Sequence, residues 1–207
     1  MGLSAAALRA SLDALAAREP AFAAALARVG HPGPRIRERG YPTLLRTIVG
    51  QQVSVASADA VWRNLQAILG DATDPHAVAA ATDEQLRAAG LSRQKAGYAR
   101  SLADEVTSGR LPLAALPADD EEAIAALVRV KGIGRWSAEI YLLFAEGRPD
   151  IWPAGDLAVQ IEVGRILGHP ERPSEKRTRA LAEAWRPHRG AAAIFAWHHY
   201  NSDMAVI

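Results

Sequence analysis

A short turn between two apolar stretches carries the most chemical information in this chain. Residues 127–138 read Leu-Val-Arg-Val-Lys-Gly-Ile-Gly-Arg-Trp-Ser-Ala. Two glycines two apart allow backbone conformations that a Cβ would hinder. They also leave three N–H groups bare at the start of the next helix, those of Ile133, Gly134 and Arg135. Because a helix N-terminus attracts anions, and Lys131 and Arg135 add positive charge, the pattern predicts a phosphate-binding turn.

A carboxylate downstream of this turn is the second candidate for chemistry. Residues 151–155, Ile-Trp-Pro-Ala-Gly, form a loop, and Asp156 then opens an apolar-patterned helix. Taken alone, an aspartate in this place is typical of a helix N-cap, which accepts a backbone N–H. The same carboxylate can cap the helix and face a cleft, so the two roles are compatible.

Helices must position both features, because strand signals are scarce. Alanine is abundant, β-branched runs are few, and no stretch alternates with period two for long. The sequence predicts an all-α protein of roughly ten short helices, arranged as a compact array of two lobes with a cleft between them. The lobes are expected at about 40–150 and at 1–39 plus 151–207. The expected helices are 4–18, 20–29, 41–52, 54–69, a short one from 74, one from 82, 92–107, one from 119 or 120, 137–145, 156–167, 174–185 and 189–199.

Composition narrows the functional class. The 207 residues have 49% apolar side chains, no cysteine and a formal net charge of +1. The absence of cysteine excludes disulfides, zinc–thiolate sites and cysteine-held iron–sulfur clusters. We find no signal-peptide pattern and no apolar run long enough for a membrane span, so we expect a soluble, cytoplasmic monomer. A near-neutral chain can still bind DNA through one basic face, because phosphate contacts are local.

The turn and the carboxylate together resemble the helix-hairpin-helix (HhH-GPD) DNA glycosylase superfamily. In that family a Gly-h-Gly hairpin grips a DNA backbone, and an essential aspartate follows a Gly/Pro-rich loop. Three further segments are similar to the 3-methyladenine DNA glycosylase II branch: residues 48–56 (IVGQQVSVA), residues 90–96 (GLSRQKA), and Trp185-Arg186-Pro187 with Trp197. The resemblance covers about residues 40–200. Members of this branch often carry an N-terminal α/β domain, which we do not expect in a chain of this length.

The resemblance implies base excision repair by a monofunctional enzyme. Relatives that also cleave the strand carry a lysine in the hairpin where this chain has Trp136, and a tryptophan cannot be that nucleophile. The expected reaction on double-stranded DNA is hydrolysis of the N-glycosidic bond of a flipped alkylated purine, of the 3-methyladenine or 7-methylguanine type. Asp156 is the expected catalytic residue, because a carboxylate near C1′ stabilises an oxocarbenium-like sugar.

The remaining site residues are also implied by the resemblance. Aromatic side chains are expected to wall the base pocket: Trp136, Trp197, Tyr141 and Trp152. Ile140 and Leu157 stand where some relatives have tyrosine, so the pocket is less aromatic than theirs. The expected DNA contacts are Lys131, Gly132, Ile133, Gly134, Arg135, Gln51, Gln52, Ser54, Arg93 and Lys95. Either Gln51 or Gln52 fills the gap that the flipped nucleotide leaves.

No cofactor or catalytic metal is expected. The resemblance implies at most a structural Na⁺ or K⁺ between the hairpin carbonyls of Val130 and Ile133 and a DNA phosphate. His198 and His199 are expected in the core or on the surface, because no carboxylate stands at a metal-site spacing from them. Three alternatives stay open: a bifunctional glycosylase/AP lyase, a non-catalytic module that binds damaged DNA through the hairpin, and a helical protein that does not bind DNA. The sequence does not order the individual alkylated and deaminated bases by preference.

Overall fold

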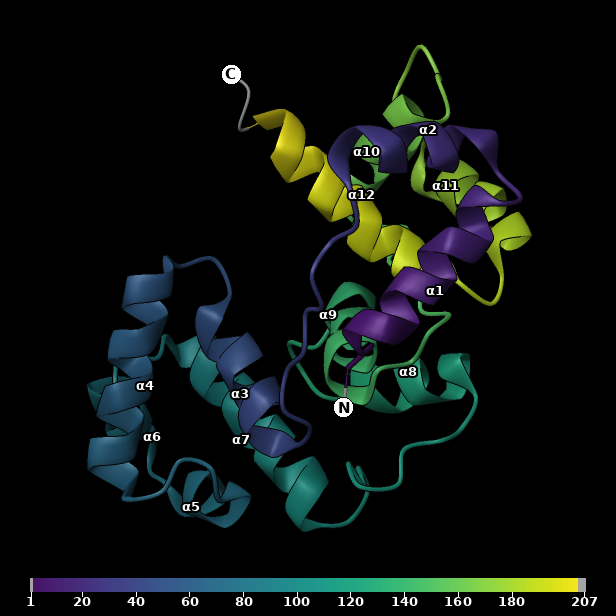
Figure 1. Ribbon diagram of the computed structural model, residues 1–207. Helices are drawn as coiled ribbons and strands as arrows, with labels where there is room; N and C mark the ends of the chain where they lie inside the picture. The colour runs from purple at the N-terminus through teal and green to yellow at the C-terminus, as the bar shows by residue number, and fades with distance from the viewer. Residues whose placement is uncertain (1, 205–207) are drawn as a thin grey trace. The chain divides into compact units, whose positions relative to one another are not determined.

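The protein is helical throughout the part of the chain that the structure describes. The computed structural model describes residues 2–204, and within that range every regular element is a helix (Figure 1). This confirms the all-α prediction. No helix among the described residues has both the length and the apolar character that crossing a bilayer requires.

Two compact units divide the chain. Unit 1 consists of Met1–Arg37 and Leu142–Ile207, and unit 2 is Glu38–Tyr141. The second boundary falls inside a helical stretch, between Tyr141 and Leu142, whereas the sequence placed it near residue 150. No proline, glycine or polar linker marks Tyr141, so composition alone offered no signal there.

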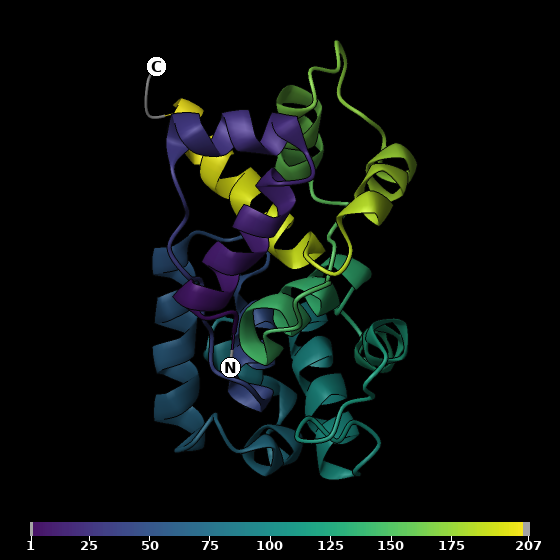
Figure 2. The same cartoon turned by 45° about the vertical axis from the view of Figure 1, so that its right-hand side comes forward.

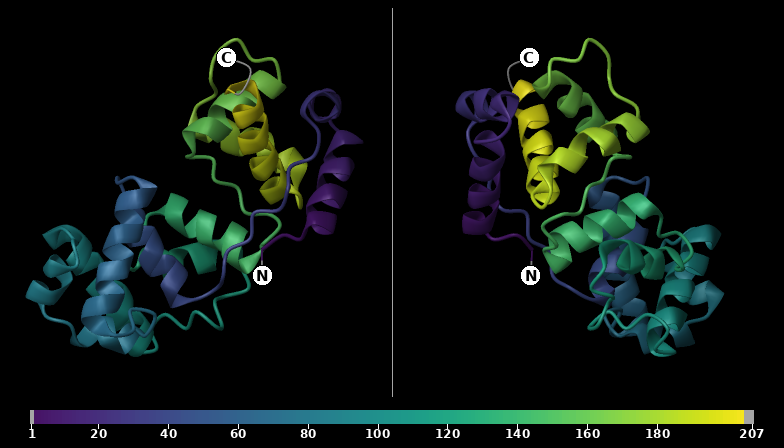
Figure 3. Two further views of the ribbon diagram at one scale, coloured as in Figure 1. Left: turned by 60° about the vertical axis from the view of Figure 1, so that its left-hand side comes forward. Right: turned by 90° about the vertical axis from the view of Figure 1, so that its right-hand side faces the viewer.

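Unit 2 is built around α7. Its apolar core includes Leu44, Leu45 and Ile48 of α3, which form an apolar stripe along one face of that helix. α7 contacts α3, α5 and α6, and the left panel of Figure 3 shows these helices in blue and teal. The helices of unit 2 are α3 (Tyr41–Gly50), α4 (Val55–Leu69), α5 (Pro75–Ala80), α6 (Asp83–Ala88), α7 (Arg93–Thr107), α8 (Asp120–Val128) and α9 (Arg135–Tyr141).

Capping side chains set where these helices begin. Thr82 and Gln85 form a reciprocal capping box, with the Thr82 hydroxyl accepting from the Gln85 N–H. The other N-caps of unit 2 whose side chains accept a backbone N–H are Ser54, Asp74, Ser92 and Asp119. Each cap satisfies a backbone donor that has no partner within its helix, and so favours the observed start of that helix.

Unit 1 is organised around α12. This helix contacts α1, α2 and α10, and Figure 2 shows its yellow ribbon beside the purple α1. Phe22 of α2 packs edge-on against Trp185, with ring centroids 5.0 Å apart, and also meets Phe195 of α12. The helices of unit 1 are α1 (Ala5–Ala16), α2 (Pro20–Val29), the π-helix η1 (Leu142–Glu146), α10 (Leu157–Ile166), α11 (Glu175–Leu181), the 3₁₀-helix η2 (Ala182–Trp185) and α12 (Arg189–Met204).

The predicted helices are found, with changes at three places. The segment expected at 137–145 begins at Arg135 and continues as the π-helix η1, and the segment expected at 174–185 ends in the 3₁₀-helix η2. α12 extends to Met204, five residues beyond the expected end at 199. A hydrophobic pattern read at 3.6 residues per turn does not distinguish α, π and 3₁₀ winding, so the sequence did not specify these turns.

Candidate functional site

The hairpin between α8 and α9 depends on its two glycines in different ways. Gly132 has φ +86°, and a Cβ there would lie 2.2 Å from Cδ2 of Tyr98 on α7. Gly132 is therefore required by the protein's own packing. A Cβ on Gly134 would meet nothing within 4 Å. The space beside Gly134 lets another molecule approach the backbone closely.

Polar contacts from α3 and α7 fasten this turn. The Lys131 N–H donates to Oγ of Ser101 at 3.0 Å, and Nε2 of Gln51 donates to the carbonyl of Gly132 at 2.8 Å. Within the turn, the Ile133 N–H donates to the Val130 carbonyl at 3.0 Å. This corrects the prediction for Ile133, whose N–H is not bare. The turn is thus held in one conformation by side chains from distant parts of unit 2.

The two glutamines of the predicted DNA contact have separate environments. Gln51 is half-buried and bonded to Gly132, whereas Gln52 is exposed and has φ +54°, which is unusual for a residue with a side chain. Nζ of Lys95 donates to the carbonyl of Val49 at 2.7 Å, and burial lowers the pKa of this lysine. Gln51 therefore supports the turn, Lys95 holds the C-terminal end of α3, and Gln52 is exposed.

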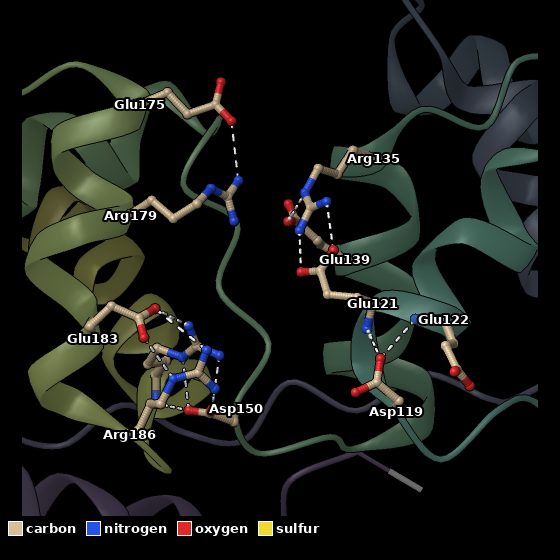
Figure 4. A network of polar contacts seen from close by, with 11 residues as sticks. Asp119, Glu121, Glu122, Arg135, Glu139, Asp150, Glu175, Arg179, Glu183 and Arg186 are labelled. Carbon is tan, nitrogen blue, oxygen red and sulfur yellow. Dashed lines mark hydrogen bonds and ion pairs between the residues drawn. The ribbon is translucent and has the colours of Figure 1, made fainter.

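Arg135 is engaged by two carboxylates of its own unit. Its guanidinium donates to both oxygens of Glu121 at the start of α8, at 2.9 and 2.5 Å, and its Nε donates to the buried Glu139 at 2.9 Å (Figure 4). The hydrogen bonds to Glu121 raise the pKa of Arg135 further above its ordinary value. These contacts join α8 to α9, and they favour a structural role over the predicted phosphate contact.

The other predicted DNA contacts differ in their surroundings. Ser54 is exposed, and its hydroxyl accepts the Ser57 N–H as the N-cap of α4. Arg93, the first residue of α7, lines a small pocket together with Asp83, Glu84 and Arg87. Lys131 is exposed beside the turn.

Asp156 lies in unit 1 as the N-cap of α10. Its Oδ1 accepts the Val159 N–H at 3.0 Å and the indole N–H of Trp197 at 3.1 Å. Trp197 belongs to α12, and its ring meets Phe144 with centroids 5.6 Å apart. The sequence predicted both residues for the site, and the structure brings them together through this hydrogen bond. Two donors on one oxygen hold the carboxylate in a single orientation.

The loop before Asp156 is tied down by its own backbone and by α10. The Asp156 N–H donates to the carbonyl of Pro153 at 2.9 Å, and the buried amide of Gln160 donates to the carbonyl of Ala154 at 2.8 Å. Gln160 was not identified from the sequence, although a polar residue within an apolar helical pattern was the available signal. These two hydrogen bonds therefore fix the backbone of the loop that carries the Asp156 carboxylate.

The predicted pocket aromatics separate into exposed and buried side chains. Trp136 is 47% exposed on α9, and Leu157, next to Asp156, is 55% exposed. Trp152 is buried, donates its indole N–H to the Thr178 carbonyl at 3.2 Å, and packs edge-on against Trp185. We correct its predicted place in the pocket, because these contacts are those of a core residue.

Tyr141 receives the same correction. It is buried, and its hydroxyl accepts the Gly40 N–H at 2.8 Å, so it orders the start of α3. Its neighbour Ile140 is also buried. Among the described residues, no group of His, Asp and Glu side chains is arranged to hold a metal ion. His198 donates to the carbonyl of Val29, and His199 is buried against Glu162.

Known proteins resemble the chain in sequence and fold. The family model of the HhH-GPD superfamily base excision DNA repair protein matches residues 45–187. DNA-3-methyladenine glycosylase 1 of Schizosaccharomyces pombe is 30% identical over 165 residues, which cover 78% of this chain and 72% of that protein. The crystal structure of a DNA-3-methyladenine glycosidase from Bacillus halodurans superposes with a TM-score of 0.86 at 27% identity, covering 94% of this chain and 91% of the other. The S. pombe 3-methyladenine DNA glycosylase (Mag1) in complex with abasic DNA has a TM-score of 0.75 at 27% identity, covering 94% and 96%.

Proposed function

The chain belongs to the HhH-GPD superfamily of base excision DNA repair proteins, and from this premise we propose that it is a monofunctional DNA glycosylase. Its reaction is hydrolysis of the N-glycosidic bond of an alkylated purine in double-stranded DNA, which leaves an abasic site. The observation that carries the proposal is the Asp156 carboxylate, which accepts hydrogen bonds from the Val159 N–H and the Trp197 indole N–H. Relatives named as 3-methyladenine glycosylases support the choice of alkylated bases.

The hairpin holds the DNA backbone in this proposal. The N–H groups at the start of α9 donate to a phosphate, and the space beside Gly134 allows the close approach that such a contact needs. Lys131 adds charge at the same place. Gln52, which is exposed on a left-handed backbone position, fills the gap in the duplex when the damaged nucleotide leaves the stack.

Asp156 acts on the sugar. The C1′–N bond breaks with its electron pair leaving on the base, and positive charge develops on C1′ and the ring oxygen. The ionised carboxylate stabilises that charge, and a water molecule adds its oxygen to C1′ and loses a proton. A base alkylated on a ring nitrogen already carries positive charge, so it departs as a neutral molecule without a general acid. Trp136 and Trp197 suit such an electron-poor base through stacking and cation–π attraction.

The reaction stops at the abasic site because Trp136 stands where a lyase carries its amine. The carbonyls of Val130 and Ile133 suit a monovalent cation, since a carbonyl oxygen has a second lone pair even when it accepts an N–H, as that of Val130 does. Such an ion would supply positive charge for a phosphate at the hairpin.

Base release from methylated DNA tests this function directly. The protein is incubated with duplex DNA treated with a methylating agent, and released bases are identified by mass spectrometry, with unmethylated duplex as the control. We expect free 3-methyladenine or 7-methylguanine and strand breaks only after alkali or heat. Strand cleavage without alkali, together with a covalent adduct trapped by borohydride, would instead establish a lyase. Salt-sensitive DNA binding without release of any base would establish a non-catalytic module.

A further inference from the structure

Unit 1 contains a buried ionic network that the proposed reaction does not use. Glu162 of α10 is fully buried, and His199 of α12 is 2% exposed. Nδ1 of His199 lies 2.5 Å from Oε2 of Glu162, and Nη1 of Arg165 donates to Oε1 of the same carboxylate at 2.7 Å. On the other side of the imidazole ring, the guanidinium of Arg28 on α2 contacts Nε2 of His199.

The partners of His199 determine where its proton lies. A guanidinium only donates hydrogen bonds, so Nε2 must accept from Arg28. The ring proton is therefore on Nδ1, where it is donated to the carboxylate of Glu162. A neutral imidazole thus stands between a cation and an anion, and Arg28 selects the tautomer that can bind Glu162.

This network lies on the two helices that carry the candidate catalytic pair. α10 begins at Asp156 and carries Glu162, and α12 carries both Trp197 and His199. The two helices are consequently joined by two polar links, Trp197 to Asp156 and His199 to Glu162. Together with the packing of α12 on α1, α2 and α10, these two links fix its rotation and its position along α10.

We propose that Glu162, His199 and Arg28 are positioning residues, which set α12 against α10 so that Trp197 orients the Asp156 carboxylate. The proposal rests on the proposed function of Asp156. It also assigns a role to the N-terminal helices, because α2 supplies Arg28, and its Val29 carbonyl accepts a hydrogen bond from His198 of α12 at 3.0 Å. Stability alone explains such a network poorly, since apolar replacements of buried ion pairs are often as stable or more so.

Variants of His199 separate positioning from general stability. His199→Phe fills the space but removes both ring nitrogens, whereas the amide of His199→Asn can still donate to Glu162 from near the Nδ1 position. Leu12→Ala is the stability control, because Leu12 is fully buried in the core of unit 1 on α1 and belongs to no polar link. The measurements are single-turnover release of 7-methylguanine, affinity for a duplex with an abasic-site analogue, and the indole ¹H–¹⁵N resonance of Trp197, assigned with Trp197→Phe.

We expect His199→Phe to slow base release about tenfold or more, because small displacements of catalytic groups are costly. Its DNA affinity should change by less than about twofold, since the hairpin belongs to the other unit. The Trp197 indole resonance should move in His199→Phe and stay in place in His199→Asn and in Leu12→Ala. Both of the latter should release base at nearly the wild-type rate at temperatures well below their melting points.

A folded His199→Phe variant with the wild-type rate and an unmoved Trp197 resonance would overturn the proposal. If that variant does not fold, Arg28→Met provides the test, because it removes the guanidinium that selects the tautomer and its side chain lies at the surface. We then expect a shifted Trp197 resonance and slower release, and wild-type values for both would overturn the proposal. A wild-type protein that releases no base refutes the proposed function instead, and the resonance still decides whether the network orients Trp197.

Discussion

The hairpin of unit 2 and the Asp156 loop of unit 1 use different chemical groups: the first presents backbone groups, and the second a side chain. At the hairpin the groups offered to a ligand are backbone N–H groups, and the side chains of Tyr98, Ser101 and Gln51 only hold the turn in shape. At Asp156 the proposed functional group is a side chain, and another side chain, that of Trp197, orients it. A backbone site is sensitive to added Cβ atoms, whereas a side-chain site is sensitive to the loss of single hydrogen bonds.

The largest effect is expected at Asp156, where a change should affect catalysis and not DNA binding. Asn is also a good N-cap, so Asp156→Asn keeps α10 while removing the charge. We expect single-turnover base release to fall by about 10²–10³-fold, with the affinity for an abasic-site duplex nearly unchanged. A variant that kept full activity would show that Asp156 is not the catalytic residue.

The two glycines of the hairpin provide the next test, which separates folding from binding. Gly132→Ala places a Cβ against Tyr98 at a left-handed φ, and we expect unfolding to become easier by about 3 kcal/mol. Gly134→Ala has room for its methyl group, so stability should stay within about 1 kcal/mol while DNA affinity falls about tenfold. Urea unfolding and fluorescence anisotropy measure the two effects. Equal DNA affinity for Gly134→Ala and wild type would show that the hairpin backbone does not contact DNA closely at Gly134.

Trp197→Phe sharpens the comparison at the side-chain site. The ring can still pack on Phe144, but Asp156 loses the indole donor. A hydrogen bond to a charged group typically contributes enough for about a tenfold slower base release. Excision kinetics at saturating enzyme provide the measurement. An unchanged rate would mean that the Val159 N–H alone orients the carboxylate.

The smallest effect is expected from the two cations beside the hairpin. Lys131→Gln should lower the slope of log affinity against log salt by about one, as the loss of one phosphate contact requires. Arg135→Gln should leave that slope unchanged and lower the melting temperature, because Arg135 is bound to Glu121 and Glu139. Salt titrations of both variants on undamaged duplex decide this. A reduced slope for Arg135→Gln would show that Arg135 contacts a DNA phosphate, as the sequence predicted.

Local patterns were sufficient for much of the fold. Caps such as Ser92, Thr82 and Asp119 act on backbone groups within three residues, so their effect is legible in the sequence. The Gly-x-Gly turn and the aspartate at the head of α10 are local features of the same kind. The sequence did not predict that a side chain at position 132 would clash, because the clash is with Tyr98, a residue distant in the sequence.

Residues that looked equivalent in the sequence were separated by their surroundings. Trp136 and Trp152 are both tryptophans near the predicted site, yet one is half exposed and the other is bonded within the core. Gln51 and Gln52 are adjacent, and only the first is bonded to the hairpin. Burial and hydrogen-bond partners come from contacts across the chain, so no local pattern could decide between them.

The sequence by itself determined an all-helical protein with a Gly-x-Gly turn at 132–134 and a capping carboxylate at Asp156, because these depend on propensity, turn geometry and capping over a few residues. Only the tertiary structure decided that Trp197 orients Asp156 and that Arg135 joins α8 to α9. It also decided that Glu162, His199 and Arg28 form one network. Each of these decisions depends on side chains that meet over long sequence separations. Their partners are selected by helix packing, which the order of residues does not display.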